Sequence, residues 1–227
     1  ALKEFPDSTR LKMAYFQALC EKGEETLAMQ LWQEIPHGAL TDPLDRKMLE
    51  MLAWGVLKKG ESSTQINVKL NAMLGGAFTR DAKAIPMLLS GLRSSNALLR
   101  SVAIRIAPSY GDAPLKEEMA RLLKEERVWY VRLDVIASVG MMRLYELKSQ
   151  LKEIVADPRT LVEEKSAAII ALVGMYDSIE QEELKGLVFS DRAGLIQLSA
   201  ELITHLQLSD QLCLLIPLLK DSCPDVR

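Results

Sequence analysis

Residues 94–107 read SSNALLRSVAIRIA, and residues 126–139 read ERVWYVRLDVIASV. Each stretch places an apolar residue before an arginine and continues with apolar residues at helical spacing. This apolar–basic pair, complete or degenerate, recurs every 30–33 residues along most of the chain. A period of this length is typical of repeat proteins, in which each unit packs on its neighbours. The pairs are Val68-Lys69, Leu99-Arg100, Val131-Arg132 and Val226-Arg227, with degenerate copies at Glu164-Lys165 and Ile196-Gln197.

Each repeat is predicted to contain two helices. In the second repeat the first helix covers 81–93, a second apolar stripe covers 99–107, and residues 108–111 end it. We therefore expect an all-α fold, a right-handed α-solenoid of stacked antiparallel helix hairpins. The other expected helices are 44–58 and 63–77, 112–124 and 126–141, 143–156 and 160–175, 178–189 and 191–206, and 208–220.

Two further columns follow the same period. A small residue, usually alanine, lies three positions after the basic residue, where it lets neighbouring helices approach closely. Six positions before the basic residue, four of five repeats carry Ser or Asp. We expect this residue to cap the N-terminus of the second helix. Gly75-Gly76 and Gly140 are expected to close helices. The small column is Ala72, Ala103, Val135, Ala168 and Ala200, and the cap column is Ser63, Ser94, Glu126, Asp191 and Asp221.

The pattern D-x-x-x-x-V-R-x-x-A, followed by apolar positions, resembles the HEAT repeat family over about 44–227. The short period is similar to that of the bacterial, PBS-lyase-type repeats. The resemblance implies that the second helices line a concave face and that the basic positions form a structural ladder between repeats. It also implies that 41–227 are HEAT repeats with the last one truncated, so we expect a longer parent protein. The ladder positions are Lys69, Arg100, Arg132, Lys165, Gln197 and Arg227.

The first forty residues have a different pattern. Two apolar helix faces are separated by Gly23, and the second face ends at Pro36. Together with Ala28 and Trp32, Gly23 resembles part of a tetratricopeptide repeat. We expect residues 1–40 to form a tetratricopeptide-like helix hairpin continuous with the solenoid, with 37–43 as the joint.

Composition narrows the function classes. The 227 residues are 48% apolar and 5% aromatic, with a net charge of −3. This charge balance gives no excess of Lys and Arg that would favour binding to the phosphates of a nucleic acid. Three cysteines without CxxC spacing favour a reducing, cytoplasmic compartment and argue against a metal site. No apolar run in this fragment is long enough to span a membrane. We expect no cofactor.

The positions following the basic column are small, mixed in character and nearly uncharged. Such a surface suits a protein or peptide partner better than a polyanion. The sequence therefore favours a non-catalytic scaffold or adaptor that binds through the concave face. The candidate binding residues are Asn71, Ser101, Arg105, Asp134, Ser166 and Ser199.

Two alternatives remain open. The first is an accessory or lyase-type HEAT protein that holds a substrate or chromophore. The second, less favoured, is a HEAT-like DNA glycosylase, because Trp129, Tyr130 and Asp134 combine aromatic rings with an acid that could stabilise a flipped base. The simpler interpretation of these aromatic residues is that they fill the gap between repeats.

Overall fold

The computed structural model describes residues 8–34, 43–220 and 224. All regular secondary structure within these ranges is helical, so the fold is all-α, as the sequence predicts. The chain divides into two compact units, 1–88 and 89–227, and the division falls inside α5 (Ile85–Leu92). The boundary expected at residue 40 lies outside the described residues. None of the described helices is both long enough and apolar enough to cross a bilayer.

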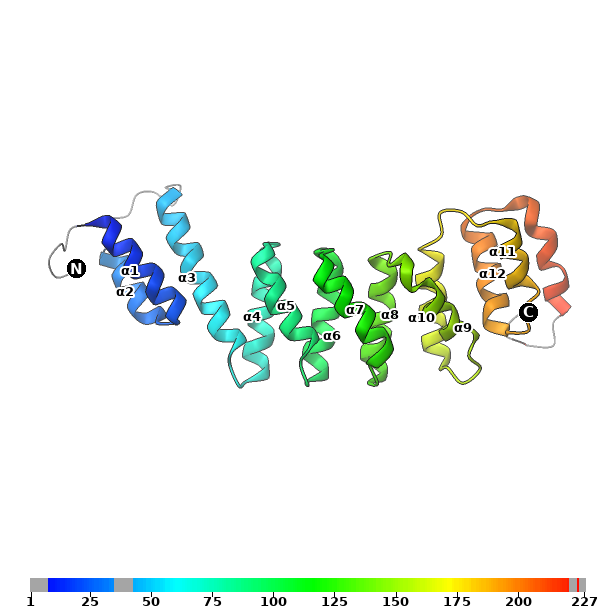
Figure 1. The fold of residues 1–227 in the computed structure, drawn as a ribbon, viewed down its shortest axis with the longest axis horizontal. Helices are drawn as coiled ribbons and strands as arrows, with labels where there is room; N and C mark the ends of the chain where they lie inside the picture. The colour runs from blue at the N-terminus through cyan, green and yellow to red at the C-terminus, as the bar shows by residue number, and fades with distance from the viewer. Residues whose placement is uncertain (1–7, 35–42, 221–223, 225–227) are drawn as a thin grey trace. The chain divides into compact units, whose positions relative to one another are not determined.

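The first unit is built from two helix pairs (Figure 1). α1 (Thr9–Lys22) and α2 (Glu25–Glu34) form a hairpin that packs on α3 (Pro43–Glu61). Gly23 joins α1 to α2 in the left-handed conformation, with φ 74°, which a glycine adopts without strain. α3 then packs against α4 (Ile66–Phe78), which the short 3₁₀ turn η1 (Ala82–Ala84) follows. The buried core of the first three helices is Phe16, Leu19, Cys20, Ala28, Leu31, Met48 and Leu52.

The second unit contains a row of second helices (Figure 1). α8 contacts both α6 and α10, and α10 contacts α12. The preceding helix of each pair, α7, α9 or α11, packs on its own partner. The bounds are α6 (Ala97–Ile106), α7 (Ala113–Glu125), α8 (Trp129–Met141), α9 (Lys148–Ala156), α10 (Val162–Val173), α11 (Gln181–Val188) and α12 (Ala193–His205), with 3₁₀ segments η2 (Ala107–Ser109) and η3 (Tyr145–Leu147).

The end of the described chain differs from the prediction. The expected helix 208–220 is formed by two 3₁₀ segments, η4 (Ser209–Leu215) and η5 (Pro217–Lys220). Leu218 of η5 still joins a buried cluster with Leu184 of α11 and Ile203 of α12. The segment therefore covers the last hairpin without α-helical hydrogen bonding.

The glycines expected to close helices lie inside them. Gly75 and Gly76 belong to α4, and Gly140 belongs to α8. A Cβ atom on Gly140 would lie 2.7 Å from the Cβ atom of Ala171, so this glycine permits the close approach of α8 and α10. The turns after the second helices instead use left-handed residues near the repeat period, namely Arg80, Gly111, Arg143 and Gln207.

The cap column also needs correction. Ser94 Oγ accepts the N–H of Asn96 at 3.1 Å, and Asn96 is the residue that caps α6, by accepting the N–H groups of Leu98 and Leu99. Ser63 likewise bonds only the turn before α4. The serine and aspartate signal thus marks the turn two residues ahead of the helix. Before α12 the turn uses Ser190 in place of the expected Asp191, and Asp221 lies outside the described residues.

The column of small residues is buried in four repeats. Ala72, Ala103, Val135 and Ala168 have at most 5% exposure. In α12, however, Ala200 is half-buried, whereas the preceding Ser199 is fully buried. The repeat register inferred for α12 is therefore wrong by about one residue.

Candidate functional site

The ladder position Arg100 joins two successive repeats of the second unit. Its Nε donates to Glu126 Oε2 at 2.7 Å, and its Nη2 donates to Glu126 Oε1 at 3.0 Å. Its Nη1 donates to the carbonyls of Ser94 and Ser95. Burial opposes ionisation of Glu126, but the hydrogen bonds from Arg100 and from the Val128 amide outweigh it and hold the pKa of this carboxyl below its ordinary value. Arg100 thus acts as a structural tie.

The other ladder positions behave unequally. Arg132 donates to Glu164 Oε2 at 2.9 Å and to the carbonyl of Leu123 at 2.9 Å, which ties α8 to α10 and α7. Lys69 and Lys165 make no ion pair with any described residue, Gln197 carries no charge, and Arg227 lies outside the described residues. The period therefore marks real inter-repeat ties only where arginine occupies the position.

Three of the six predicted binding residues are exposed. Asn71, Arg105 and Ser166 face solvent. Ser101 is buried, and Asp134 is half-buried: Ser101 Oγ donates to Asp134 Oδ2 at 2.6 Å, and Arg105 Nε donates to Asp134 Oδ1 at 2.8 Å.

The assignment of Ser199 to the binding surface is wrong. It is fully buried and donates to the carbonyl of Ile196 at 2.6 Å. Its side chain cannot contact a partner, because the register of α12 differs from the inferred one.

An exposed apolar surface accompanies the exposed candidates. Leu98 and Tyr130, in the first turns of α6 and α8, each lie two residues before a ladder arginine, and Trp129 of α8 and Val162 of α10 each lie three residues before their ladder positions. Because these helices pack successively, equivalent positions lie on one face of the row. Ser166 and Ile170 continue the stripe of Val162 along α10 at four-residue spacing. We call this surface the apolar face, and we define it as Leu98, Trp129, Tyr130, Val162 and Ile170.

The aromatic residues Trp129 and Tyr130 do not fill a gap between repeats. Trp129 is 58% exposed, and its ring meets that of Tyr130 edge to face, with 6.1 Å between centroids. Both oxygens of Asp134 are already hydrogen-bonded, to Ser101 and Arg105. The constellation that motivated the glycosylase alternative is therefore an exposed aromatic pair beside an internally bonded carboxylate.

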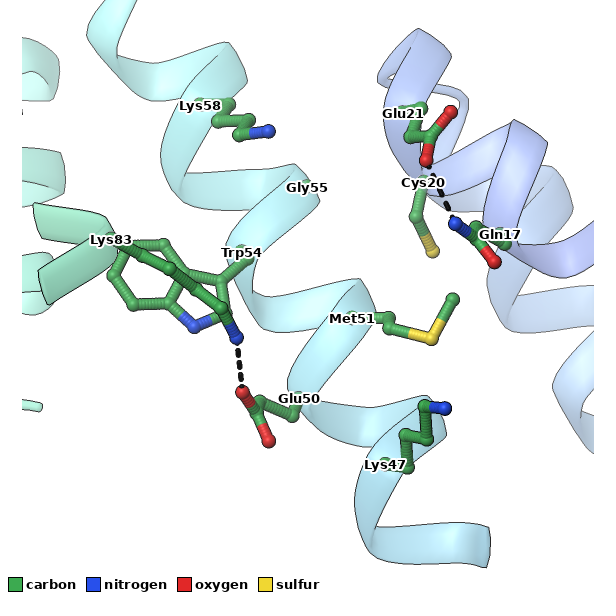
Figure 2. A pocket seen from close by; sticks show the side chains of 10 residues that line it. All are labelled: Gln17, Cys20, Glu21, Lys47, Glu50, Met51, Trp54, Gly55, Lys58 and Lys83. Carbon is green, nitrogen blue, oxygen red and sulfur yellow. Dashed lines mark hydrogen bonds and ion pairs between the residues drawn. The ribbon is translucent and has the colours of Figure 1, made fainter. Parts of the chain in front are cut away.

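A second candidate site lies in the first unit (Figure 2). A cavity of about 410 Å³ is lined by α1, α3 and η1. Met51 and Cys20 extend into the space between α1 and α3, whereas Trp54 lies on the other flank of α3 with Lys83 across its ring (Figure 2). Lys83 Nζ donates to Glu50 at 2.7 Å and lies 5.8 Å from the Trp54 ring centroid.

The cavity wall is held in place by close helix packing. A Cβ atom on Gly55 of α3 would lie 2.8 Å from the carbonyl oxygen of Cys20 on α1, so no larger residue fits without moving a helix. Burial, with a smaller contribution from Glu21, raises the pKa of the Cys20 thiol and keeps it neutral. The cavity therefore has an uncharged, sulfur-lined wall.

This cavity was not predicted from the sequence. A signal existed, because Lys47, Met51, Trp54 and Lys58 follow helical spacing on α3. The stripe does not recur with the period of 30–33 residues, so the repeat pattern does not indicate it.

A third group of polar side chains joins α9, α11 and Tyr176, which precedes α11. Lys152 Nζ and the Tyr176 hydroxyl both donate to Glu183 Oε1 at 2.6 Å. Burial opposes ionisation of Glu183, but these two donors outweigh it and lower its pKa. Lys148 Nζ lies 3.6 Å from the Tyr176 ring centroid. These groups satisfy one another and join α9 to α11.

Comparison with known proteins does not assign the chain to a family. A search against protein-family models finds no match, and a search of curated proteins finds none either. Within the described ranges, no group of three His, Cys, Asp or Glu side chains could hold a metal ion.

Proposed function

We propose that this chain is a HEAT-type, right-handed α-solenoid that acts as a non-catalytic scaffold and binds a protein partner through the apolar face. The observation that carries the proposal is the exposure of large apolar side chains at equivalent positions on helices that pack side by side. Ile170 is 74% exposed and Val162 is 72% exposed. Large apolar side chains left exposed on neighbouring helices support this proposal, because exposed apolar patches mark interaction sites.

The charges near the apolar face support binding by apolar burial. Arg105 and Asp134 are paired with each other across α6 and α8. Arg100 and Glu126 are bound to each other and are largely buried. Few charges therefore need to lose water when a partner covers the face, which lowers the cost of association.

A cytoplasmic location is part of the proposal. Cys20 and Cys213 are unpaired, and Cys213 is exposed. Unpaired thiols are retained most readily in a reducing compartment.

The proposed function is tested by comparing partner capture by the wild-type protein and by Ile170→Glu. Burying a carboxylate in an apolar contact is unfavourable, so we expect partner binding to weaken by about tenfold or more. Gln181→Glu is the matched control, because it adds the same charge at an exposed position on α11 outside the apolar face. Equal capture by Ile170→Glu and wild type would contradict the proposal.

The repeat architecture has its own test. A compact globule of this length has a radius of gyration of roughly 17 Å. Small-angle scattering should give a clearly larger value if the hairpins belong to an extended solenoid. A value near that of a globule would exclude this part of the proposal.

A further inference from the structure

The cavity of the first unit presents an apolar wall between two amines. Lys47 and Lys58 are eleven residues apart on α3, so they lie within about 20° of each other around the helix and about 16 Å apart along it. Met51 and Trp54 lie between them along α3 but on opposite flanks of the helix, and Cys20 of α1 faces Met51 (Figure 2). The volume of about 410 Å³ falls in the range of pockets for small molecules.

The charges of this cavity are unequally matched. Its lining includes three lysines and two glutamates. Lys83 is engaged by Glu50, which raises the pKa of Lys83 and removes both charges from competition. Neither Lys47 nor Lys58 has an ion-pair or hydrogen-bond partner in the described part of the chain.

The two free amines differ in their surroundings. Glu21 and Lys58 line this cavity together and also share a neighbouring cavity of about 220 Å³. Figure 2 shows both at the same end of the site, with Gln17 bonded to Glu21. The field of Lys58 is therefore partly offset by a carboxylate. Lys47 at the other end is the unmatched cation.

We propose that this cavity binds a small organic anion with an apolar body, with the anionic group at Lys47 and the body against Met51 and Cys20. The amine supplies charge complementarity for a carboxylate or sulfonate, and the apolar wall supplies burial. The neutral thiol of Cys20 adds apolar contact without a competing charge. This site lies in the first unit and is independent of the apolar face.

The test uses two probes with the same rings. Anilinonaphthalene sulfonate carries an anion, and N-phenylnaphthylamine is its neutral counterpart. We expect saturable binding of the sulfonate, measured by fluorescence titration, and a shift of the Met51 methyl signal in spectra of methyl-labelled methionine. Lys47→Glu should lower the affinity for the sulfonate by about tenfold, and Lys47→Gln should lower it by about two- to fivefold. Neither change should have much effect on the affinity for the neutral probe. Lys58→Gln should have the smaller effect of the two glutamine variants.

Three controls keep the outcome decisive. Lys124→Glu makes the same charge reversal on α7, outside the cavity, and should leave sulfonate binding unchanged. Ile170→Glu separates this site from probe adsorbed on the apolar face. Lys47 is exposed and unpartnered, so circular dichroism melts of its variants should match the wild type. Absence of saturable binding, equal losses in Lys124→Glu, or sulfonate affinity unchanged by Lys47→Glu would overturn the proposal.

Discussion

The two units join their successive hairpins by different kinds of polar contact. In the second unit, Arg100 binds Glu126 through two hydrogen bonds, and only 14% and 4% of their side-chain surfaces are exposed. In the first unit, Lys83 binds Glu50 through a single contact between two side chains that are about half exposed. Exposed lysine pairs contribute little to stability, whereas a buried bidentate arginine pair fixes geometry.

This difference explains where each candidate site lies. The second unit pairs Arg100 and Arg132 internally and exposes the large apolar side chains Ile170 and Val162 on α10. The first unit leaves Lys47 and Lys58 unpaired beside an apolar cavity. One region therefore offers apolar surface to a macromolecule, and the other offers a charged pocket to a small molecule.

The largest expected effect concerns the core of the second unit. Ile136 of α8 is fully buried, so Ile136→Ala should lower the free energy of unfolding by about 2–5 kcal/mol. The measurement is urea unfolding followed by circular dichroism. Trp129 lies in the second unit and Trp32 and Trp54 lie in the first, so Trp129→Phe lets tryptophan emission report on the first unit alone. Wild-type stability of Ile136→Ala would show that the assigned helix face is wrong.

Removing one partner of the arginine tie should cost nearly as much. Arg100→Met leaves Glu126 buried without its cation, and we expect a loss of about 3 kcal/mol. Lys83→Met, the matched change in the first unit, should cost less than about 1 kcal/mol. The double variant Arg100→Met with Glu126→Gln should recover part of the loss. Similar losses for Arg100→Met and Lys83→Met would break the comparison between the units.

Acid should weaken the second unit through Glu126. The pKa of this carboxyl is lower in the folded chain than in the unfolded chain. Its stabilisation is therefore complete above the unfolded pKa of about 4.3 and is lost as pH falls through the folded pKa. Urea unfolding at pH 7, 4 and 3 should show this decline, and Glu126→Gln should flatten it. If the free energy of unfolding of Glu126→Gln fell with pH as steeply as that of the wild type, the decline would have to come from other carboxylates.

A smaller effect is expected at Ser138. Its buried hydroxyl donates to the carbonyl of Ile104 at 3.0 Å, which joins α8 to α6. Ser138→Ala removes this bond and should lower the free energy of unfolding by about 1 kcal/mol, measured by the same urea titration. A loss above about 3 kcal/mol would mean that the row of second helices depends on this contact far more than its geometry indicates.

Much of the helical pattern could be predicted from the sequence, and the exceptions have physical causes. The apolar–arginine pairs at Arg100 and Arg132 located helices whose arginines reach the next repeat. In α12 the basic position is Gln197, which makes no such contact, so the period alone could not fix the register and misplaced Ser199. Sequence periodicity also does not indicate which apolar residues lack a packing neighbour. It therefore predicted that Trp129 fills the gap between repeats, whereas its side chain is exposed.

The cavity was hidden for a different reason. It depends on the close crossing of α1 and α3 at Cys20 and Gly55, which are 35 positions apart in the chain. A contact between two non-repeating helices leaves no periodic trace in the sequence. The stripe of Lys47, Met51 and Trp54 becomes a site only once the second wall is in place.

Site-specific photo-crosslinking tests the central claim most directly. A photoreactive phenylalanine derivative placed at position 170 or 162, in the cell, should give a discrete adduct with one partner protein. The same group at the exposed position Glu117 of α7, away from the apolar face, should give none. Equal adducts from positions 170 and 117, or none from 170 and 162, would contradict the assignment of the apolar face as the partner-binding surface.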